Sequence, residues 1–375
     1  MAPREQSSTV PFQLERLGLL MEADPSRQVE AWGVLNPAAA RGPDGELYLF
    51  PRLVDERNYS RIGLARVRFG PHGDPVGVER LGVVLEPSAP YELRPSEETG
   101  GCEDPRVVHV AALGHYLMTY TAWGDRGPRL AVAVSKDLLT WRRLGLLEFG
   151  PAPDPHYGVD FQSYDNKDGV YFPEPVAGPD GEEALAILHR PVYGNNVPKG
   201  VGDPRPSVWL SYCRLADARH DLRNLVKVSQ HRLLMTPAQP WEALRIGAGT
   251  PPLLTPHGWL VIYHGVAGNP APVPRDLQPV EYCAGALVLD TRDPRRILYR
   301  SPEPILCPET SAEVEGLVPN VVFPTGVDPR DNGRVDVYYG MADLRIGVAS
   351  LQVPTFLPVE EEHREAQRII AAVSG

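Results

Sequence analysis

The sequence has few cysteines, no long apolar run and no excess of positive charge, and each of these absences excludes a class of protein. Its 375 residues include four cysteines, which lack the paired spacing of a metal site. We therefore expect buried free thiols and no metal ligation at Cys102, Cys213, Cys283 and Cys307.

Hydropathy and charge argue against membrane and nucleic-acid partners. The first residues, Met1 to Glu5, contain no apolar signal core, and no apolar run is long enough to cross a membrane. The formal net charge is −11, whereas the phosphates of a nucleic acid require a basic surface. We expect a cytoplasmic protein that binds neither a membrane nor nucleic acid.

Proline and glycine, by contrast, are abundant. The chain has 41 prolines and 35 glycines, and 42% of its residues are hydrophobic, which is enough for a buried core. This composition favours many short strands joined by turns over a helical bundle. The length permits either one closed repeat fold or two domains.

A weak internal repeat decides between these two. Five units each begin with a residue followed by proline; an apolar strand follows about ten residues later, and its partner strand begins roughly 20 to 35 residues after the proline. Because proline cannot donate to a sheet ladder, the residue before it is predicted to face a central channel. The units begin at Asn36-Pro37, Asp104-Pro105, Phe172-Pro173, Thr250-Pro251 and Phe323-Pro324.

We therefore predict an all-β fold, a single five-bladed β-propeller over residues 1–375. The segment Phe12–Ala23 forms either a short helix or an outer strand that closes the ring. The long loops 150–165 and 193–205 are expected to shape the mouth of the site. The predicted blades are 30–98, 99–160, 161–230, 231–310 and 311–355, with a C-terminal helix in 356–375, clearest at Val359–Val373.

Polar side chains follow the apolar strands of the five units, at Arg52, Thr121, His189-Arg190, His264 and Asp343. Equivalent strand ends of a propeller converge at one mouth of its channel, so these residues are expected to meet. With Lys167 they would form a receptor for a small anion, through charge-assisted hydrogen bonds. The alternative is that each cation forms an ordinary ion pair with a nearby acid.

Glu103 and Asp104 are the strongest candidates for acid catalysis. Asp104 stands at the channel-facing place before its proline, where a shielded carboxylate is expected to have the raised pKa that a general acid needs. The alternative is a solvated acidic turn. Aromatic residues at strand ends, Tyr120 and Trp123 among them, either stack on a sugar ring or pack in the blades.

Six short sequence motifs, in order along the chain, carry a family resemblance. They are Gly101-Cys102-Glu103-Asp104-Pro105-Arg106, Lys167-Asp168-Gly169-Val170-Tyr171-Phe172-Pro173-Glu174, His189-Arg190-Pro191, Tyr263-His264-Gly265, Pro319-Asn320-Val321-Val322-Phe323-Pro324 and Tyr339-Gly340-Met341-Ala342-Asp343. In these motifs, the sequence resembles the β-mannoside phosphorylases of glycoside hydrolase family 130, and the resemblance extends from Asn36 to about Leu351.

The resemblance implies a five-bladed propeller that cleaves a β-mannoside by phosphorolysis with inversion, giving α-mannose 1-phosphate and a free acceptor sugar. It implies that Asp104 is the single catalytic acid, acting through the 3-hydroxyl of the mannose, and that no cofactor is needed beyond inorganic phosphate as co-substrate. The implied phosphate ligands are Arg52, Lys167, Arg190 and His264. The implied substrate-binding residues are Asn36, Glu103, Arg106, Tyr120 and Asp343.

Two other functions remain open at this stage. One is a β-mannoside hydrolase on the same propeller, in which water replaces phosphate; the cations Lys167 and Arg190 argue against it. The other is a sugar-binding propeller without catalysis. The acceptor sugar is not determined by the sequence, and a homo-oligomer built through the C-terminal helix is compatible with it.

Overall fold

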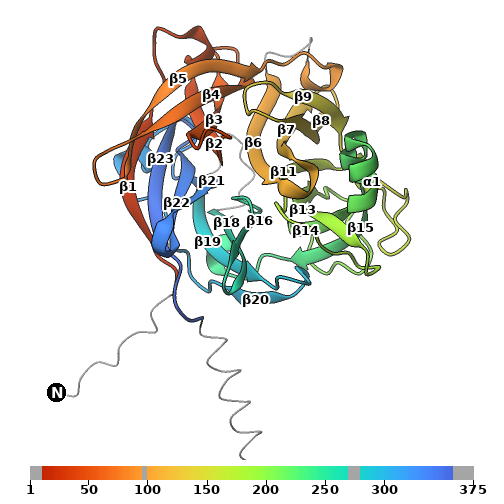
Figure 1. Cartoon of the computed structure of the whole chain (residues 1–375). Coiled ribbons are helices and arrows are strands. Elements are labelled where there is room, and N and C mark those ends of the chain that lie inside the picture. Colours follow the sequence, from red (N-terminus) through yellow and green to blue (C-terminus); the bar gives the residue numbers. More distant parts are fainter. Residues whose placement is uncertain (1–10, 95–98, 269–278, 358–375) are drawn as a thin grey trace, which may run out of the picture.

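The computed structural model describes residues 11–94, 99–268 and 279–357, and their sheets stand side by side around a central axis (Figure 1). The predicted all-β fold, a five-bladed propeller, is confirmed. The predicted helix at Val359–Val373 lies outside the described residues. None of the helices in these three ranges is long and apolar enough to span a membrane.

Blades 1 and 2 each contain four antiparallel strands, and they are joined by a short parallel pairing of Tyr59 and Ser60 with Gly100 and Gly101. Blade 1 consists of β2 (Gly33–Arg41), β3 (Leu47–Val54), β4 (Tyr59–Phe69) and β5 (Pro75–Leu85). Blade 2 consists of β6 (Gly100–Val110), β7 (His115–Gly124), β8 (Gly127–Ser135) and β9 (Arg142–Leu146).

Blades 3 and 4 repeat this arrangement with small additions. Blade 3 consists of β11 (Asp165–Tyr171), β13 (Glu183–Val192), β14 (Val208–Arg214) and β15 (Lys227–Met235), with β10 (Glu148–Phe149) and β12 (Val176–Ala177) at its edges. Blade 4 consists of β16 (Arg245–Gly247), β18 (Gly258–Gly268), β19 (Val280–Leu289) and β20 (Ile297–Arg300), with β17 (Leu253–Thr255) paired to β18.

Blade 5 combines the two ends of the described chain. Its strands are β21 (Val322–Pro329), β22 (Arg334–Met341), β23 (Arg345–Gln352) and, from the N-terminal side, β1 (Leu14–Met21). Pairing of β1 with β23 closes the ring, so the predicted alternative of an outer strand for Phe12–Ala23 is confirmed. Arg16 on β1 pairs with the buried carboxylate of Glu313, at 2.9 Å.

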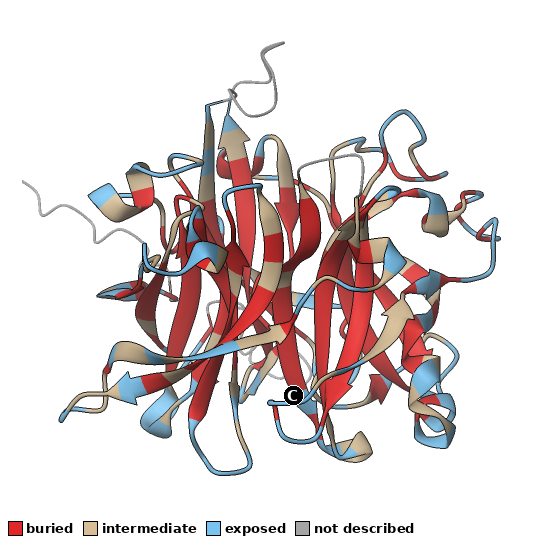
Figure 2. Ribbon diagram, turned by 90° about the horizontal axis from the view of Figure 1, so that it is seen from above, coloured by how far each residue is buried: buried red, intermediate tan, exposed pale blue. Residues whose placement is uncertain are grey.

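The helices are short and lie in the connections. They are the α-helices α1 (Leu215–His220) and α2 (Ser311–Val314), and the 3-10 turns η1 (Gln28–Glu30), η2 (Pro90–Glu92), η3 (Ala111–Leu113), η4 (Phe161–Ser163), η5 (Leu222–Val226), η6 (Pro240–Glu242) and η8 (Asp331–Gly333). Buried residues follow the strands through the ring and exposed residues gather in the loops (Figure 2), so the core is a set of contacts between neighbouring blades.

The innermost strands bulge where they reach the channel. On β6 the pairing register shifts between Glu103 and Arg106, so that Asp104 and Pro105 together lie across from Tyr120. The same shift places Asn36 on β2 and Asp168 on β11 in equivalent positions. A bulge changes the direction of a side chain. The φ angles of Asn36, Asp104 and Asp168 are positive, at 45°, 46° and 57° respectively.

This register corrects part of the predicted repeat. The equivalence of Asn36 and Asp104 holds, but the residues of blades 3, 4 and 5 that were aligned with them are displaced along their strands. Phe172 lies in the blade core with its side chain fully buried, four residues beyond the true equivalent, Asp168. Thr250 lies two residues beyond the position of blade 4 that is equivalent to Asp104. Phe323 lies one residue before the equivalent position of blade 5.

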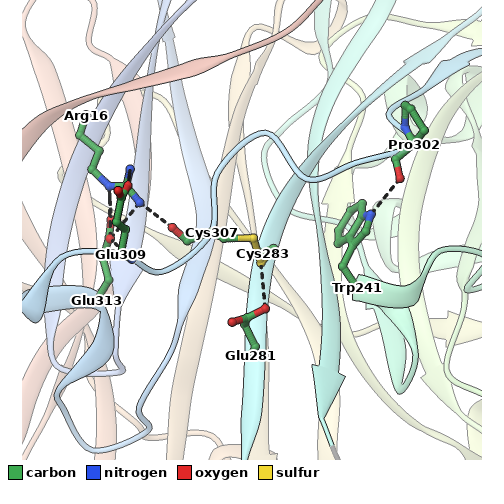
Figure 3. The surroundings of a disulfide bond; sticks show 8 residues. All are labelled: Arg16, Trp241, Glu281, Cys283, Pro302, Cys307, Glu309 and Glu313. Carbon is green, nitrogen blue, oxygen red and sulfur yellow. Dashed lines mark hydrogen bonds and ion pairs between the residues drawn. A yellow bond between two sulfur atoms is a disulfide. The ribbon is translucent and has the colours of Figure 1, made fainter. Parts of the chain in front are cut away.

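The expectation of four free thiols is wrong for two of them. Cys283 on β19 and Cys307 form a disulfide, with their Cα atoms 4.5 Å apart (Figure 3). Cys102 and Cys213 are free and buried, as predicted. The sequence separation of Cys283 and Cys307 gave no sign of a bond, because the pairing of β19 with the segment around Leu306 brings them together.

Candidate active site

A cavity of about 620 Å³ opens at one end of the channel and receives side chains from every blade. This volume is in the range of pockets that hold small ligands. The polar and aromatic lining residues are Asn36 and Arg52 from blade 1, Glu103, Asp104 and Trp123 from blade 2, Lys167, Asp168 and Arg190 from blade 3, Arg245, His264 and Tyr282 from blade 4, and Phe323 and Asp343 from blade 5.

The strand register explains why these residues converge. Arg52 and Arg190 are opposite Leu35 and Lys167, the last residues before the bulge on their inner strands. His264 is opposite Gly247, the last residue of β16. Equivalent positions of different blades face the same end of the channel. The predicted meeting of strand-end residues is therefore confirmed for these three.

The lining residues divide into two groups by charge. The first, which we call the acidic cluster, contains Glu103, Asp104 and Asp343 with Arg52 and Lys167. Glu103 accepts hydrogen bonds from Arg52, at 2.7 Å, and from Lys167, at 3.0 Å. Asp104 accepts through Oδ1 from Asn36, at 2.8 Å, and from Arg52, at 3.2 Å. Three carboxylates thus share two cations.

The expected raised pKa of Asp104 is wrong. Burial alone would raise it, but Arg52, Lys167 and the Asn36 hydrogen bond together hold the pKa of Asp104 below its usual value. Burial and the charges of Asp104 and Glu103 instead raise the pKa of Asp343 to about 6, against the opposing effect of Arg52. In weakly acidic solution, a proton on Asp343 therefore relieves the surplus negative charge of the acidic cluster.

The second group, the cationic cluster, contains Arg190 and Arg245 with Asp168 and His264, and it adjoins Arg106, which does not line the cavity. Arg190 donates through Nε to Asp168, at 2.6 Å, and His264 Nε2 lies 3.7 Å from the same carboxylate oxygen. Burial opposes ionisation, but Arg190, His264 and Arg106 lower the pKa of Asp168 to about 2. The Asp168 carboxylate therefore lies close to the guanidinium groups of Arg190 and Arg106 and to the His264 ring.

His264 is uncharged near neutral pH. Burial, with Arg190 and Arg106 nearby, lowers its pKa to about 3 despite the attraction of Asp168. Its ring stacks on Tyr282 with a centroid distance of 6.0 Å, and Tyr282 accepts a hydrogen bond from Arg245, at 2.6 Å. A neutral imidazole in this place can still donate one N–H to an anion.

Two predicted substrate-binding residues do not line the cavity. Arg106 is 1% exposed, and its guanidinium donates to the backbone carbonyls of Gly249 and Asp104, at 2.6 and 2.8 Å, so it fixes the backbone of the acid. Tyr120 is also 1% exposed, and its hydroxyl donates to the buried Glu92 at 2.6 Å. The other eight predicted site residues line the cavity.

The sequence reasoning did not single out Asp168, Arg245 or Tyr282. Asp168 could have been found by aligning the bulges, since Asp168-Gly169 takes the place of Asp104-Pro105. Arg245 and Tyr282 carry no such signal, because only the pairing of blade 4 strands brings them to His264. Trp123 lies at the cavity with Lys167 Nζ 4.7 Å from its ring centroid.

Two glycines leave the space that the side chains of Asp168, His264 and Asn36 occupy. A Cβ on Gly247 would come within 2.2 Å of Asp168 Oδ2 and 2.5 Å of the His264 ring. A Cβ on Gly340 would come within 1.9 Å of Asn36 Oδ1. Both glycines stand on strands that border the cavity, so their lack of a side chain is part of the site.

The acidic cluster is arranged for binding hydroxyl groups rather than metal ions, since Glu103 and Asp104 are paired with Arg52 and Lys167. Among the described residues, the one group of three that could hold a metal is Glu281, Cys283 and Cys307, and the two sulfurs of that group are bonded to each other. The cavity can therefore place a sugar beside Asp104 and an anion beside Arg190.

Comparison with known proteins identifies the family. A family model described as β-1,4-mannooligosaccharide phosphorylase, that of glycoside hydrolase family 130, matches residues 14–362. A 1,2-β-oligomannan phosphorylase of Thermoanaerobacter sp. (strain X514) is 32% identical over 331 residues, which are 86% of this chain and 91% of that protein. A β-1,4-mannooligosaccharide phosphorylase of Ruminococcus albus is 28% identical over 253 residues, 64% of this chain and 67% of that protein.

The fold is also shared with solved structures. A β-1,2-mannobiose phosphorylase of Listeria innocua in complex with β-1,2-mannobiose has a TM-score of 0.65 and 23% identity, covering 91% of this chain and 97% of that one. At this level of identity, the likeness shows a common fold.

Proposed function

The chain belongs to glycoside hydrolase family 130, and on that premise we propose that it cleaves a β-mannoside by phosphorolysis with inversion, giving α-mannose 1-phosphate and a free acceptor sugar. The observation that carries the proposal is the division of one cavity into an acidic and a cationic cluster. Such a cavity has one place for a sugar next to a carboxylic acid and another for a phosphate.

Asp104 is the proton donor in this proposal. Its described contacts both reach Oδ1, so Oδ2 is the oxygen that can serve a substrate hydroxyl. The proton passes to the bridging oxygen through the 3-hydroxyl of the mannose, and phosphate attacks the anomeric carbon. A second carboxylate acting as base is not needed, because phosphate is a nucleophile without deprotonation.

Phosphate binding supplies the condition under which Asp104 is protonated. The low pKa of Asp104 depends on Arg52 and Lys167. A phosphate dianion adds negative charge to the cavity and competes for these cations, and both effects raise the pKa of a neighbouring carboxyl group. Asp343, with its pKa of about 6, is a nearby carboxyl group that already carries a proton in weakly acidic solution.

The phosphate ligands we propose are Arg190, His264 and Lys167, with Arg52 shared between phosphate and the acidic cluster. Arg190 uses Nε for Asp168. Its terminal nitrogens then remain for a bidentate contact with phosphate. The mannose is held by Asn36 and Asp343; the Oδ1 atom of Asn36 is buried without a described hydrogen-bond partner and suits a sugar hydroxyl. Glu103 orients Arg52 and Lys167.

The test is to incubate the protein with β-1,2- and β-1,4-linked mannobiose, with and without inorganic phosphate. We expect α-mannose 1-phosphate to form only when phosphate is present, and Asp104→Asn to lower the rate by about 10³-fold, as expected for loss of a general acid. Mannose release at the same rate without phosphate would establish a hydrolase instead. No turnover in either direction, including synthesis from α-mannose 1-phosphate and a panel of acceptors, would leave a sugar-binding propeller.

A further inference from the structure

Four of the five blades contain a fully buried glutamate in the connection that leads to the inner strand. Each is at most 2% exposed, and each accepts hydrogen bonds from an arginine on the outermost strand of its blade and from backbone N–H groups just before it. The four residues are Glu30, Glu92, Glu242 and Glu313. In blades 2, 4 and 5 a tyrosine of the second strand also donates to the glutamate.

In blade 4 this arrangement joins three elements, and we call Glu242, Tyr263 and Arg300 the blade-4 clamp. Tyr263 donates its hydroxyl to Glu242 Oε1, at 2.7 Å, and Arg300 donates to Oε2. The N–H groups of Ala238 and Gln239 donate to Oε2 at 2.7 and 2.9 Å. A buried carboxylate with this many donors is held in one position.

The clamp holds β18 on both sides of His264. Tyr263 is bonded to Glu242, and Gly265 packs against the same turn, because a Cβ on Gly265 would lie 2.4 Å from the Trp241 ring and 2.8 Å from Glu242. Trp241 in turn donates its indole N–H to the carbonyl of Pro302, at 3.3 Å (Figure 3). The strand therefore has little freedom to slide or rotate at this point.

His264 projects from the opposite face of β18, because successive side chains on a strand alternate. There its ring packs so closely on Gly247 and Asp168 that a Cβ on Gly247 would clash with both side chains. The ring also faces Arg190 in the cationic cluster. A small displacement of β18 would therefore change the position of the imidazole relative to Asp168 and Arg190.

We propose that Glu242, Tyr263 and Arg300 are positioning residues for phosphate, which they affect by fixing the strand that presents His264. This inference rests on the proposed function, in which His264 and Arg190 bind phosphate. The clamp itself does not touch the cavity, since none of its residues lines it. Its effect is expected on the phosphate side of the reaction and not on the mannoside side.

Blade 3 supports the proposal, because it also anchors the residue that precedes a cavity-lining cation, with different side chains. The residue before Arg190 is His189, whose Nε2 lies 2.8 Å from the hydroxyl of Ser211, and Ser211 contacts His231 at 2.8 Å. Here too, the residue that precedes a cavity-lining cation is anchored within the blade by buried hydrogen bonds to the two outer strands.

The experiment compares Tyr263→Phe with Tyr339→Phe, which removes the same hydroxyl from the equivalent clamp of blade 5, where the next residue is Gly340. Both changes remove one buried hydrogen bond. Kinetics of phosphorolysis and calorimetric titration with inorganic phosphate are measured on the full chain. We expect Tyr263→Phe to raise the KM and Kd for phosphate roughly tenfold, as changes behind a ligand commonly do, with the KM for the mannoside within about twofold.

Tyr339→Phe is expected to lower the melting temperature to a similar degree while leaving the phosphate affinity unchanged. Equal phosphate affinity in the two variants, with both folded, would overturn the proposal. If Tyr263→Phe does not fold, Glu242→Gln, which keeps the shape of the side chain, takes its place in the same comparison.

A separate measurement distinguishes failure of this proposal from failure of the proposed function. The ring signals of His264, assigned with His264→Gln, are recorded by NMR in the wild type and in both variants. If the wild type binds no phosphate, the proposed function fails, but a shift of the His264 signals in Tyr263→Phe and not in Tyr339→Phe still supports positioning. Unchanged signals in Tyr263→Phe would refute it.

Discussion

At the scale of single residues, the cavity shows how neighbours decide which carboxyl group holds a proton. Asp104 and Asp343 are both partly buried and line the same cavity, yet the pKa of Asp104 is lowered and that of Asp343 is raised to about 6. Asp104 receives hydrogen bonds from Arg52 and Asn36, whereas Asp343 faces the charges of Asp104 and Glu103. Burial acts on both residues, so the partners make the difference.

Asp343→Asn is expected to stabilise the protein at pH 8 and to have little effect at pH 4. The pKa of Asp343 is raised by about two units, so its charged form destabilises the fold by up to about 3 kcal/mol above pH 6, and the penalty disappears as the pH falls to its ordinary value. Urea denaturation of both proteins across this pH range measures the difference. A gain that is the same at both pH values would contradict the raised pKa.

At the scale of elements, the site depends on how closely the inner strands approach the second strands. Each inner strand of blades 1, 2 and 3 bulges beside the cavity, and blade 4 brings β16 against His264 through a glycine. The obstacle at Gly247 is space and not backbone conformation, because its φ lies outside the region that favours glycine.

Gly247→Ala is expected to weaken phosphate binding by roughly tenfold or more, because its Cβ would force Asp168 or His264 to move. Calorimetric titration with inorganic phosphate measures the change. Gly202→Ala is the matched control, since a Cβ on that exposed residue would meet no atom within 4 Å. Unchanged phosphate affinity in Gly247→Ala would show that the strand can shift without cost.

The disulfide gives a second prediction at this scale. It closes a loop with a sequence separation of 24 residues, for which chain entropy predicts a stabilisation of about 3 kcal/mol. A reducing agent is expected to lower the free energy of unfolding of the wild type by this amount. The double variant Cys283→Ser, Cys307→Ser should not respond, and thiol titration of the denatured wild type should find only Cys102 and Cys213. Four titratable thiols without reduction would contradict the bond.

The connections that contain the buried glutamates share a sequence signal of their own. In four connections a proline precedes the buried glutamate by five positions, namely Pro25 and Glu30, Pro87 and Glu92, Pro237 and Glu242, and Pro308 and Glu313. The proline and the glutamate stand at the two ends of a turn, and backbone N–H groups of this turn donate hydrogen bonds to the carboxylate. This spacing marks four of the five blade boundaries, whereas the residue-proline pairs are displaced from the equivalent positions in blades 3, 4 and 5.

At the scale of the whole molecule, the ring is closed by a strand from the start of the described chain. β1 completes blade 5 by pairing with β23, and Arg16 supplies the charge that Glu313 needs. The hydroxyl of Tyr339 and two backbone N–H groups also reach Glu313. The closure therefore combines a sheet edge with a buried ion pair.

Arg16→Met is expected to destabilise the protein by about 3 to 5 kcal/mol, because it leaves a fully buried carboxylate without its cation. The matched control is Arg66→Met, which breaks a pair with Glu79 in which both side chains are 40% or more exposed, and should cost less than about 1 kcal/mol. Urea denaturation measures both. Equal costs would mean that ring closure does not depend on the buried pair.

The sequence by itself determined the strand-and-turn composition and the number of repeated units, and it predicted eight residues that line the cavity, because these follow from local patterns and short motifs. Tertiary structure alone decided the register of blades 3 to 5, the disulfide, the places of Arg106 and Tyr120, and the grouping of charges around Asp104 and Asp168. The physical reason is that strand register is set by pairing with neighbouring strands, so the residue-proline pairs do not mark equivalent positions in blades 3 to 5. In addition, each pKa is set by side chains that other blades bring from distant parts of the chain.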